Sequence, residues 1–378
     1  MNLSLRRITS GGSYIPEIDG LRFVAIASVV IYHTYVQTDV RVVLGGMPFW
    51  IEHLRRGVEL FFIISGFILG LPFAKQYLAG GKQVRIGAYF LRRLTRLEPP
   101  YILILCIRAA GLLAATHALG YIATHLLANI LYVHSLWYGY ASVIHFVTWS
   151  LEIEVQFYCL APLLAMIFLL RPAWMRRLLL LIAIIAMGYA QLAWIPGAVP
   201  GVYSRVGLTI LDWAQFFLAG FLLADIYATD WKSIPESWGW DVASVLAWLG
   251  IFLLPPSPAH VWIAPLSLVA YTGAFKGKLF PAFFRFPAVP IIGGMCYSLY
   301  LTHPIVFTVM KDLLHRMHLE RRVPAWGYLA VTDLVCIPAI LLVGTIYFVL
   351  IERPCMDRDW PKKLMARLRG KRAVCQVA

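Results

Sequence analysis

An arginine and a histidine share one face of the first apolar segment. Arg22 and His33 are eleven residues apart in DGLRFVAIASVVIYHT, residues 19–34, which is almost three helical turns or roughly 16 Å along the axis. Ionisable side chains inside such a segment are costly and usually functional. A guanidinium at the mouth suits phosphate, and a deep imidazole can accept a proton near neutral pH. The spacing fits a long ligand such as coenzyme A; the alternative is a hydrogen-bonded packing role for His33.

A second group of ionisable residues lies in TWSLEIEVQFYCLAP, residues 148–162. Helical spacing of four places three side chains on one face: Ser150, Glu154 and Tyr158. Glu152 lies on roughly the opposite face. Because unpaired burial of a carboxylate is prohibitive, we expect one of the two acids to hold His33 in a defined tautomer, as the acid of a hydrolase triad does. Alternatively, the pair of acids binds the hydroxyls of an acceptor.

The motif GVELFFIISGF, residues 57–67, carries one more carboxylate. Glu59 is placed either to orient His33 or to pair with the arginines just before the motif. Ser65 and Gly66 form a small surface that favours close helix packing.

A basic motif, RRLTRLEPPY, covers residues 92–101. Arg93 and Arg96 are three apart at an expected helix start, where both can face one anion. The alternative is a positive stretch that only fixes topology. Pro99 and Pro100 are expected near the first turn of the helix.

The segment GGMCYSLYLTHPIVF, residues 293–307, predicts a helix interrupted at Pro304. Tyr300 and His303 lie on one side of it. His303 either lines the gap that admits an acceptor or satisfies a carbonyl freed by the proline.

The composition predicts the elements that hold these residues. Of 378 residues, 60% are hydrophobic and 14% are charged, whereas soluble domains have about 45 to 50% apolar and about 25% charged residues. This indicates an all-α, polytopic membrane helix bundle. The net charge is +14. The basic residues that produce it lie mostly between the apolar segments, which favours a role in membrane topology over nucleic-acid binding. The six cysteines show no metal or redox spacing.

Apolar segments long enough to span a membrane predict about ten helices. They lie near residues 20–38, 57–74, 97–116, 146–170, 178–195, 207–227, 241–255, 259–275, 288–310 and 326–351. Basic clusters follow the second, fourth and eighth helices and fill the tail, so both termini are predicted to be cytoplasmic. The basic loop 311–322 is an exception to this rule or an interfacial stretch. No internal repeat is visible, which argues against a proton-coupled transporter built from inverted repeats.

Together these motifs resemble acyltransferase family 3, multi-pass membrane O-acyltransferases that modify glycans, peptidoglycan, lipids and natural products. The resemblance rests on motifs in the family's order and spacing: Arg22 to His33, GVELFFIISGF, RRLTR, TWSLEIEVQFY, YSLYLTHP and IERP at 351–354. It implies that an acyl group, most often acetyl, passes from cytoplasmic acyl-CoA as co-substrate to a hydroxyl at or beyond the outer face, with no metal.

The resemblance also implies residue roles. His33 resembles the essential histidine and Arg22 its partner, while Arg93 and Arg96 resemble a donor-binding RxxR motif. Ser65 and Gly66 fall in the FFxxSGF motif, on the donor side, and Glu154 matches the first acid of SLxxEEQFY. Candidates for the acceptor side complete the set: Glu59, Glu152, Trp149, Tyr300 and His303.

Three departures leave details of the resemblance open. Val155 replaces the second acid, Glu59 replaces a common aspartate and Cys296 replaces a frequent serine. Many glycan-modifying relatives also carry an SGNH-type domain. We expect residues 1–378 to be a single membrane domain, with a core at about 15–354 and a basic cytoplasmic tail at 355–378, acting alone or with a separate protein.

The sequence therefore predicts an O-acyltransferase of a bacterial inner membrane. An extracytoplasmic or lipid-linked polysaccharide, such as an exopolysaccharide or O-antigen, is the expected acceptor, with a small hydroxylated natural product or lipid as alternative. Trp137, Tyr138 and Tyr140 could stack on sugar rings or anchor the protein at the interface. Direct transfer and an acyl-histidine intermediate both remain open, as does the oligomeric state.

Overall fold

The computed structural model describes residues 5–8, 14–38, 40–194, 206–255, 259–318, 322–357 and 359–368. Within these ranges the secondary structure is entirely helical, as the composition predicts. The last residues of the basic tail and part of the basic loop 311–322 lie outside the described residues.

Six helical segments in the described ranges are long and apolar enough to cross a membrane, or seven if one bent pair counts as a single span. The six cover Phe49–Leu78, Ile86–Thr116, Thr148–Leu169, Ala173–Leu192, Ile210–Thr229 and Ala325–Cys355. The expected number of ten is not reached because two expected spans are short helices, α11 (Trp238–Leu253) and α12 (Ile263–Lys276). In addition, polar side chains lower the hydropathy of α1 (Pro16–Gln37).

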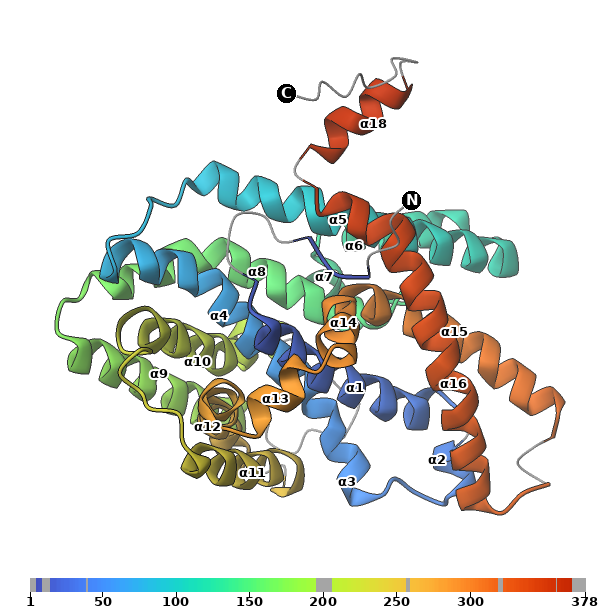
Figure 1. Cartoon of the computed structure of the whole chain (residues 1–378). Coiled ribbons are helices and arrows are strands. Elements are labelled where there is room, and N and C mark those ends of the chain that lie inside the picture. Colours follow the sequence, from blue (N-terminus) through green and yellow to red (C-terminus); the bar gives the residue numbers. More distant parts are fainter. Residues whose placement is uncertain are drawn as a thin grey trace.

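Helix α1 lies at the centre of the molecule (Figure 1). It begins with Pro16 at its first turn, where the missing N–H of proline costs no hydrogen bond. It packs against α14 (Ala288–Gly294), α4 (Gly57–Leu78) and α15 (Cys296–Arg316). Arg22 and His33 therefore face a protein interior built by three other helices.

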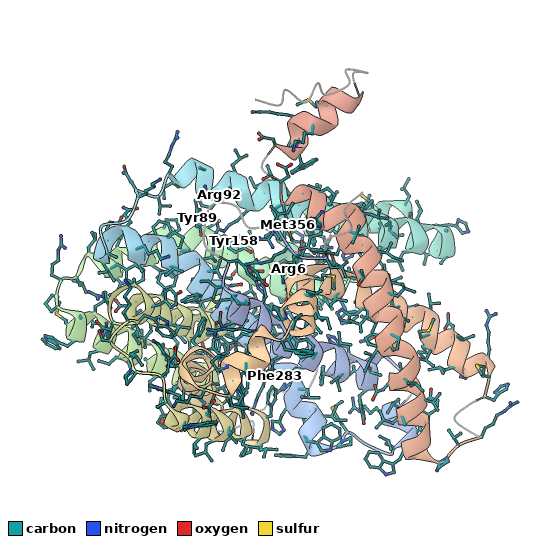
Figure 2. The ribbon with its side chains drawn as sticks, viewed as in Figure 1. Arg6, Tyr89, Arg92, Tyr158, Phe283 and Met356 are labelled. Carbon is teal, nitrogen blue, oxygen red and sulfur yellow. The ribbon has the colours of Figure 1, made fainter. Side chains whose placement is uncertain are left out.

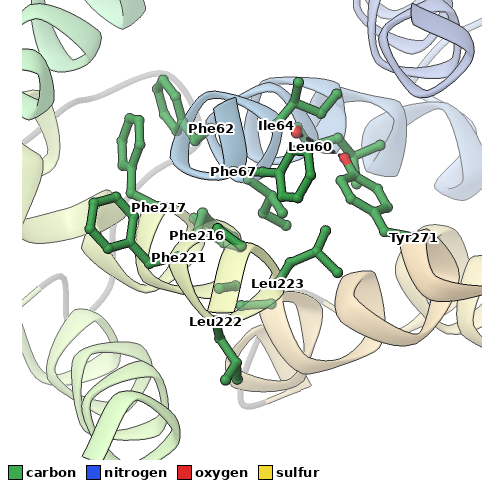
Figure 3. Close-up of a cluster of buried hydrophobic side chains, with 14 of the residues drawn as sticks. Leu60, Phe62, Ile64, Phe67, Phe216, Phe217, Phe221, Leu222, Leu223 and Tyr271 are labelled. Atoms are coloured by element: carbon green, nitrogen blue, oxygen red, sulfur yellow. Dashed lines mark hydrogen bonds between the residues drawn. The ribbon is translucent and has the colours of Figure 1, made fainter. Parts of the chain in front are cut away.

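The largest helix contact joins α4 to α10 (Ile210–Thr229). Aromatic and aliphatic side chains of both helices interleave there, and Tyr271 of α12 joins them (Figure 3). The backbones approach closely because glycines face each other: a Cβ on Gly66 would lie 2.2 Å from the carbonyl oxygen of Phe217, and one on Gly220 would lie 2.2 Å from that of Ile63. Gly66 thus has the packing role that its motif suggests.

Two helix boundaries differ from the expectations. Helix α5 runs from Ile86 to Thr116, so the RRLTR motif lies inside it and Pro99 and Pro100 are interior residues. Helix α15 continues through Pro304, and the break lies earlier, where α14 and α15 meet at 72° beside Met295. Prolines are tolerated inside membrane helices because neighbouring groups can satisfy the freed carbonyls.

The remaining longer helices complete the bundle. They are α6 (Leu119–Ile130), α8 (Thr148–Leu164), α9 (Ala173–Trp194) and α16 (Ala325–Tyr347), with a π-helical turn at Phe348–Glu352 after α16. Short helices connect them: α2 (Val40–Val43), α3 (Phe49–Glu52), α7 (His134–Tyr138), α13 (Phe280–Arg285), α17 (Arg353–Cys355) and α18 (Trp360–Leu368).

Candidate functional site

Two histidines from distant parts of the chain meet at the centre of the bundle. His33 on α1 and His303 on α15 stack with ring centroids 5.0 Å apart, and His33 Nδ1 lies 3.0 Å from His303 Nε2. His303 is fully buried, whereas His33 is half-buried. The edge of His33 meets the ring of Phe146 at 5.3 Å.

The hydrogen bonds fix the tautomers of the neutral pair. His303 Nδ1 lies 3.1 Å from the carbonyl oxygen of Leu299, and a carbonyl only accepts, so this nitrogen carries the hydrogen. His303 Nε2 must then accept, and His33 Nδ1 donates to it. The lone pair of His33 Nε2 is left to take a proton, which is the state that a general base requires. His303 also interacts with the carbonyl of Tyr300, four residues before Pro304, which is the carbonyl that the proline leaves without its helical donor.

Side chains beside the pair link α15 to the start of α8. The hydroxyl of Tyr300 lies 2.6 Å from Ser150 Oγ and donates to the carbonyl oxygen of Val147 at 2.8 Å. The ring of Tyr300 lies 5.7 Å from that of His303. Tyr300 therefore positions α8 against the histidine pair. Trp149 faces the other way and packs on Trp213, 5.3 Å between ring centroids.

The three carboxylates considered as partners of His33 bind other groups. Glu59 lies 2.9 Å from Nε2 of His260, which belongs to the 3₁₀-helical turn Ala259–Trp262 before α12. Glu152 accepts a hydrogen bond of 2.8 Å from the backbone N–H of Ser135, at the start of α7. Among the described contacts, the group that orients His33 is thus an imidazole and not a carboxylate.

Glu154 belongs to a second polar cluster, between α4 and α8. It accepts a hydrogen bond of 2.5 Å from Ser65 Oγ and also interacts with the hydroxyl of Tyr158. The guanidinium of Arg93 lies 3.8 Å from the ring centroid of Tyr89 and 5.4 Å from that of Tyr158. Figure 2 shows Tyr89 and Tyr158 close to Arg92 in the upper part of the molecule. Ser65 and Glu154 are thereby brought together, with Arg93 beside them.

Arg96 points to a different partner from Arg93. Its Nη2 lies 4.0 Å from Glu352 of the IERP motif, which is fully buried. Glu352 also accepts hydrogen bonds from Ser298, 3.0 Å from the backbone N–H and 2.5 Å from the hydroxyl. Arg93 and Arg96 therefore do not share one protein anion, because α5 presents them to different neighbours.

Arg22 and Arg7 both bind Asp19, a carboxylate that is not among the site residues predicted from the sequence. Arg22 Nη1 lies 2.7 Å from Asp19 Oδ1, and Arg7 Nε lies 2.8 Å from Asp19 Oδ2. Asp19 is fully buried. The pairing with Arg22 could have been found from the spacing of three residues on one helix, whereas nothing in the local sequence indicates Arg7.

An aromatic cluster lies around α6 and α7. Trp137 is 75% exposed, while Tyr138 stacks on the ring of His125 at 4.1 Å. Tyr140 lies 5.8 Å from the ring of His134, whose pKa burial lowers to about 4. Of the three aromatic residues singled out here, Trp137 offers the most open face to a ligand.

These contacts describe a base held in one tautomer at the centre and arginines near the first turn of α1. Within the described residues, no cluster of three His, Cys, Asp or Glu side chains is placed to hold a metal ion. Such a site can remove a proton from a hydroxyl and bind an anionic group at a distance along α1.

Comparisons with known proteins test the family resemblance that the motifs indicate. The profile of a family described as "Acyltransferase domain" matches residues 15–349. The protein named "O-acetyltransferase OatA" of Staphylococcus aureus (strain NCTC 8325 / PS 47) is 25% identical over 346 residues, which cover 84% of this chain and 54% of the relative. "Putative O-acetyltransferase SACOL0978" of Staphylococcus aureus (strain COL) is 26% identical over 344 residues, covering 83% and 54%. The chain thus spans about half the length of these relatives. No solved structure matches it.

Proposed function

Since the chain belongs to the acyltransferase family whose domain covers residues 15–349, we propose that it transfers an acetyl group from acyl-CoA to a hydroxyl of a glycan. The family establishes an acyltransferase with membrane helices. The donor, the acceptor and the residues that act on them are the proposal, and the tautomer of the His33–His303 pair is the observation that carries it.

His33 acts as the general base. Its Nε2 takes the proton of the acceptor hydroxyl while the hydroxyl oxygen attacks the carbonyl carbon of the thioester, forming a C–O bond. The C–S bond then breaks, and the leaving thiolate takes the proton back from the imidazolium, which yields the ester and free CoA. General base assistance of this kind contributes about 10² to 10⁴ in rate. His303 Nε2 accepts a hydrogen bond from His33 Nδ1–H throughout the reaction, and this keeps Nε2 of His33 directed at the substrate.

The donor enters from the end of the bundle that carries Arg22 and Arg96. Phosphate groups suit guanidinium donors, and Asp19 and Glu352 hold these two side chains in place. The eleven residues between Arg22 and His33 span roughly 16 Å of helix, so an extended pantetheine arm can carry the thioester from one to the other. Both termini are then cytoplasmic, in the plasma membrane of a bacterium.

The acceptor reaches His33 from the opposite end. A lipid-linked or exported polysaccharide fits a site whose far end carries the exposed ring of Trp137, because aromatic faces stack on sugar rings. The relatives' names specify O-acetylation, which supports acetyl as the group transferred and oxygen as its destination.

The test is release of free CoA from acetyl-CoA by the purified chain in detergent or liposomes. We expect His33→Ala to abolish release while the protein remains folded and monodisperse. His315→Ala is the matched control, because His315 lies on the surface of α15, and it should retain the wild-type rate. Equal activity of wild type and His33→Ala would remove His33 from the reaction. If the wild type neither binds nor consumes acyl-CoA with acceptors present, the donor assignment fails.

A further inference from the structure

A short N-terminal segment lies beside the arginines proposed to bind the donor. Arg353 of the IERP motif donates from Nε to the carbonyl oxygen of Arg6 at 3.2 Å. The next residue, Arg7, reaches inward to Asp19 at the first turn of α1. Figure 2 shows Arg6 near Met356, which follows α17. Motifs from the end of the chain therefore hold residues 5–8 against the beginning of α1.

Three arginines gather at this point around two carboxylates. Arg7 lies close enough to both Arg22 and Arg96 for their charges to repel. Asp19 and Glu352 form ion pairs with these arginines, and Glu154 lies within electrostatic reach of Arg22. The arginine side chains remain partly open, with 14% of Arg7 and 33% of Arg96 exposed. A cluster of arginines with accessible N–H donors is suited to an anion.

The N-terminus of α15 lies near the same arginine cluster. Its first residue, Cys296, lies within electrostatic reach of Arg7, Arg22 and Asp19. The first turn of a helix carries partial positive charge and backbone N–H groups without helical acceptors. The N–H of Ser298 in this turn already binds Glu352, so the turn adds partial positive charge to the cluster but not a full set of vacant donors.

We propose that Arg7 binds the phosphates of the acyl-CoA donor together with Arg22 and Arg96, so that the N-terminal segment forms part of the donor site. The inference rests on the proposed function. Arg7 lies before residue 15, where the family match begins, so the family motifs do not include it. Its ion pair with Asp19 directs the guanidinium toward the cluster and keeps it there before the donor arrives.

The test compares Arg7→Gln with Arg6→Gln in the full chain, using two donors. Arg6 is the matched control because it is the adjacent arginine and is exposed. With acetyl-CoA, we expect Arg7→Gln to raise KM by about tenfold, in line with the loss of a charge-assisted hydrogen bond, and Arg6→Gln to leave it unchanged. With S-acetyl-pantetheine, which lacks phosphates, Arg7→Gln and wild type should have the same KM. An equal loss with both donors, or no loss with acetyl-CoA, overturns the proposal.

A second measurement needs no variant and is independent of turnover. The wild-type chain in neutral detergent is treated with phenylglyoxal, and modification of Arg7 and Arg6 is read by mass spectrometry. CoA should protect Arg7 but not Arg6, and pantetheine should protect neither. Protection of Arg7 by phosphatidylglycerol and not by CoA would assign the cluster to a lipid headgroup and reject the proposal. If CoA binds but leaves Arg7 open to modification, the proposal for Arg7 fails while the proposed function stands.

Discussion

A chain of two hydrogen bonds determines which ring nitrogen of His33, the proposed base, carries the hydrogen. The carbonyl oxygen of Leu299 fixes the hydrogen of His303 on Nδ1, and His303 then fixes the hydrogen of His33 on Nδ1. An imidazole serves here in the place that a carboxylate takes in a hydrolase triad. A neutral partner orients the base without placing a buried negative charge next to it, a charge that would need further compensation.

Because His303 accepts a hydrogen bond from His33, we expect different substitutions at residue 303 to lower the rate of acyl transfer to different extents. His303→Leu removes the acceptor for His33 Nδ1–H, so His33 can adopt the unproductive tautomer, and kcat should fall by about 10² or more, within the range for general base assistance. The amide oxygen of Gln can accept the same hydrogen bond, so His303→Gln should recover part of this loss. The rate of CoA release at saturating donor measures both. Equal activity of the two variants would limit His303 to packing.

The sequence predicts which residues form the candidate site, but not the contacts that these residues make between helices. The position of His33, Arg22 and Glu154 in apolar helices indicated function because buried ionisable groups are costly. Spacing along one helix says nothing about contacts between helices, however. His33 and His303 are 270 residues apart, and Glu59 and His260 are 201 apart, so only the packed structure pairs them.

At the scale of elements, the crossing of α4 and α10 sets the frame for the site. Gly66 follows Ser65, whose hydroxyl binds Glu154. The absent Cβ at Gly66 lets the carbonyl of Phe217 approach. Close packing of small residues is a common way to join membrane helices. The same stretch of α4 therefore provides both a helix contact and a polar contact.

Adding one methyl group should separate these helices. Gly66→Ala places a Cβ 2.2 Å from a backbone oxygen, and overpacking of this kind typically costs about 1 to 3 kcal/mol. We expect a lower unfolding temperature in detergent. Gly111→Ala is the control, because a Cβ there meets nothing within 4 Å, and alanine favours helix by about 1 kcal/mol over glycine. Unfolding temperatures for Gly66→Ala at or above that of Gly111→Ala would contradict a close crossing.

Helices could be predicted from the sequence more reliably than their breaks. The apolar segments around α4, α8, α10 and α16 lie where hydropathy places them. The bend beside Met295 was assigned instead to Pro304, and α5 was expected to begin near Pro99. Proline alone is a poor marker of a boundary in a bundle, because tertiary contacts decide whether the helix continues.

On the scale of the whole molecule, ion pairs join loops that lie at one end of the bundle. Arg177 connects the start of α9 to Asp225 and Asp230 at the end of α10. Arg285 Nε lies 2.6 Å from Glu17, which joins α13 to the start of α1. The arginine cluster around Asp19 lies at this same end of α1. The proposed orientation places this end in the cytoplasm, in agreement with the positive-inside rule.

Helix α5 allows this orientation to be measured with one pair of variants. Lys82 lies before the helix and Thr116 ends it, and both are exposed. In a background without the native cysteines, Thr116→Cys should react with a membrane-impermeant maleimide on intact cells. Lys82→Cys should react only after the membrane is permeabilised, because the basic residues around it are retained in the cytoplasm. The reverse pattern would place the arginine cluster outside, where acyl-CoA is absent, and equal labelling of both sites would show that α5 does not cross.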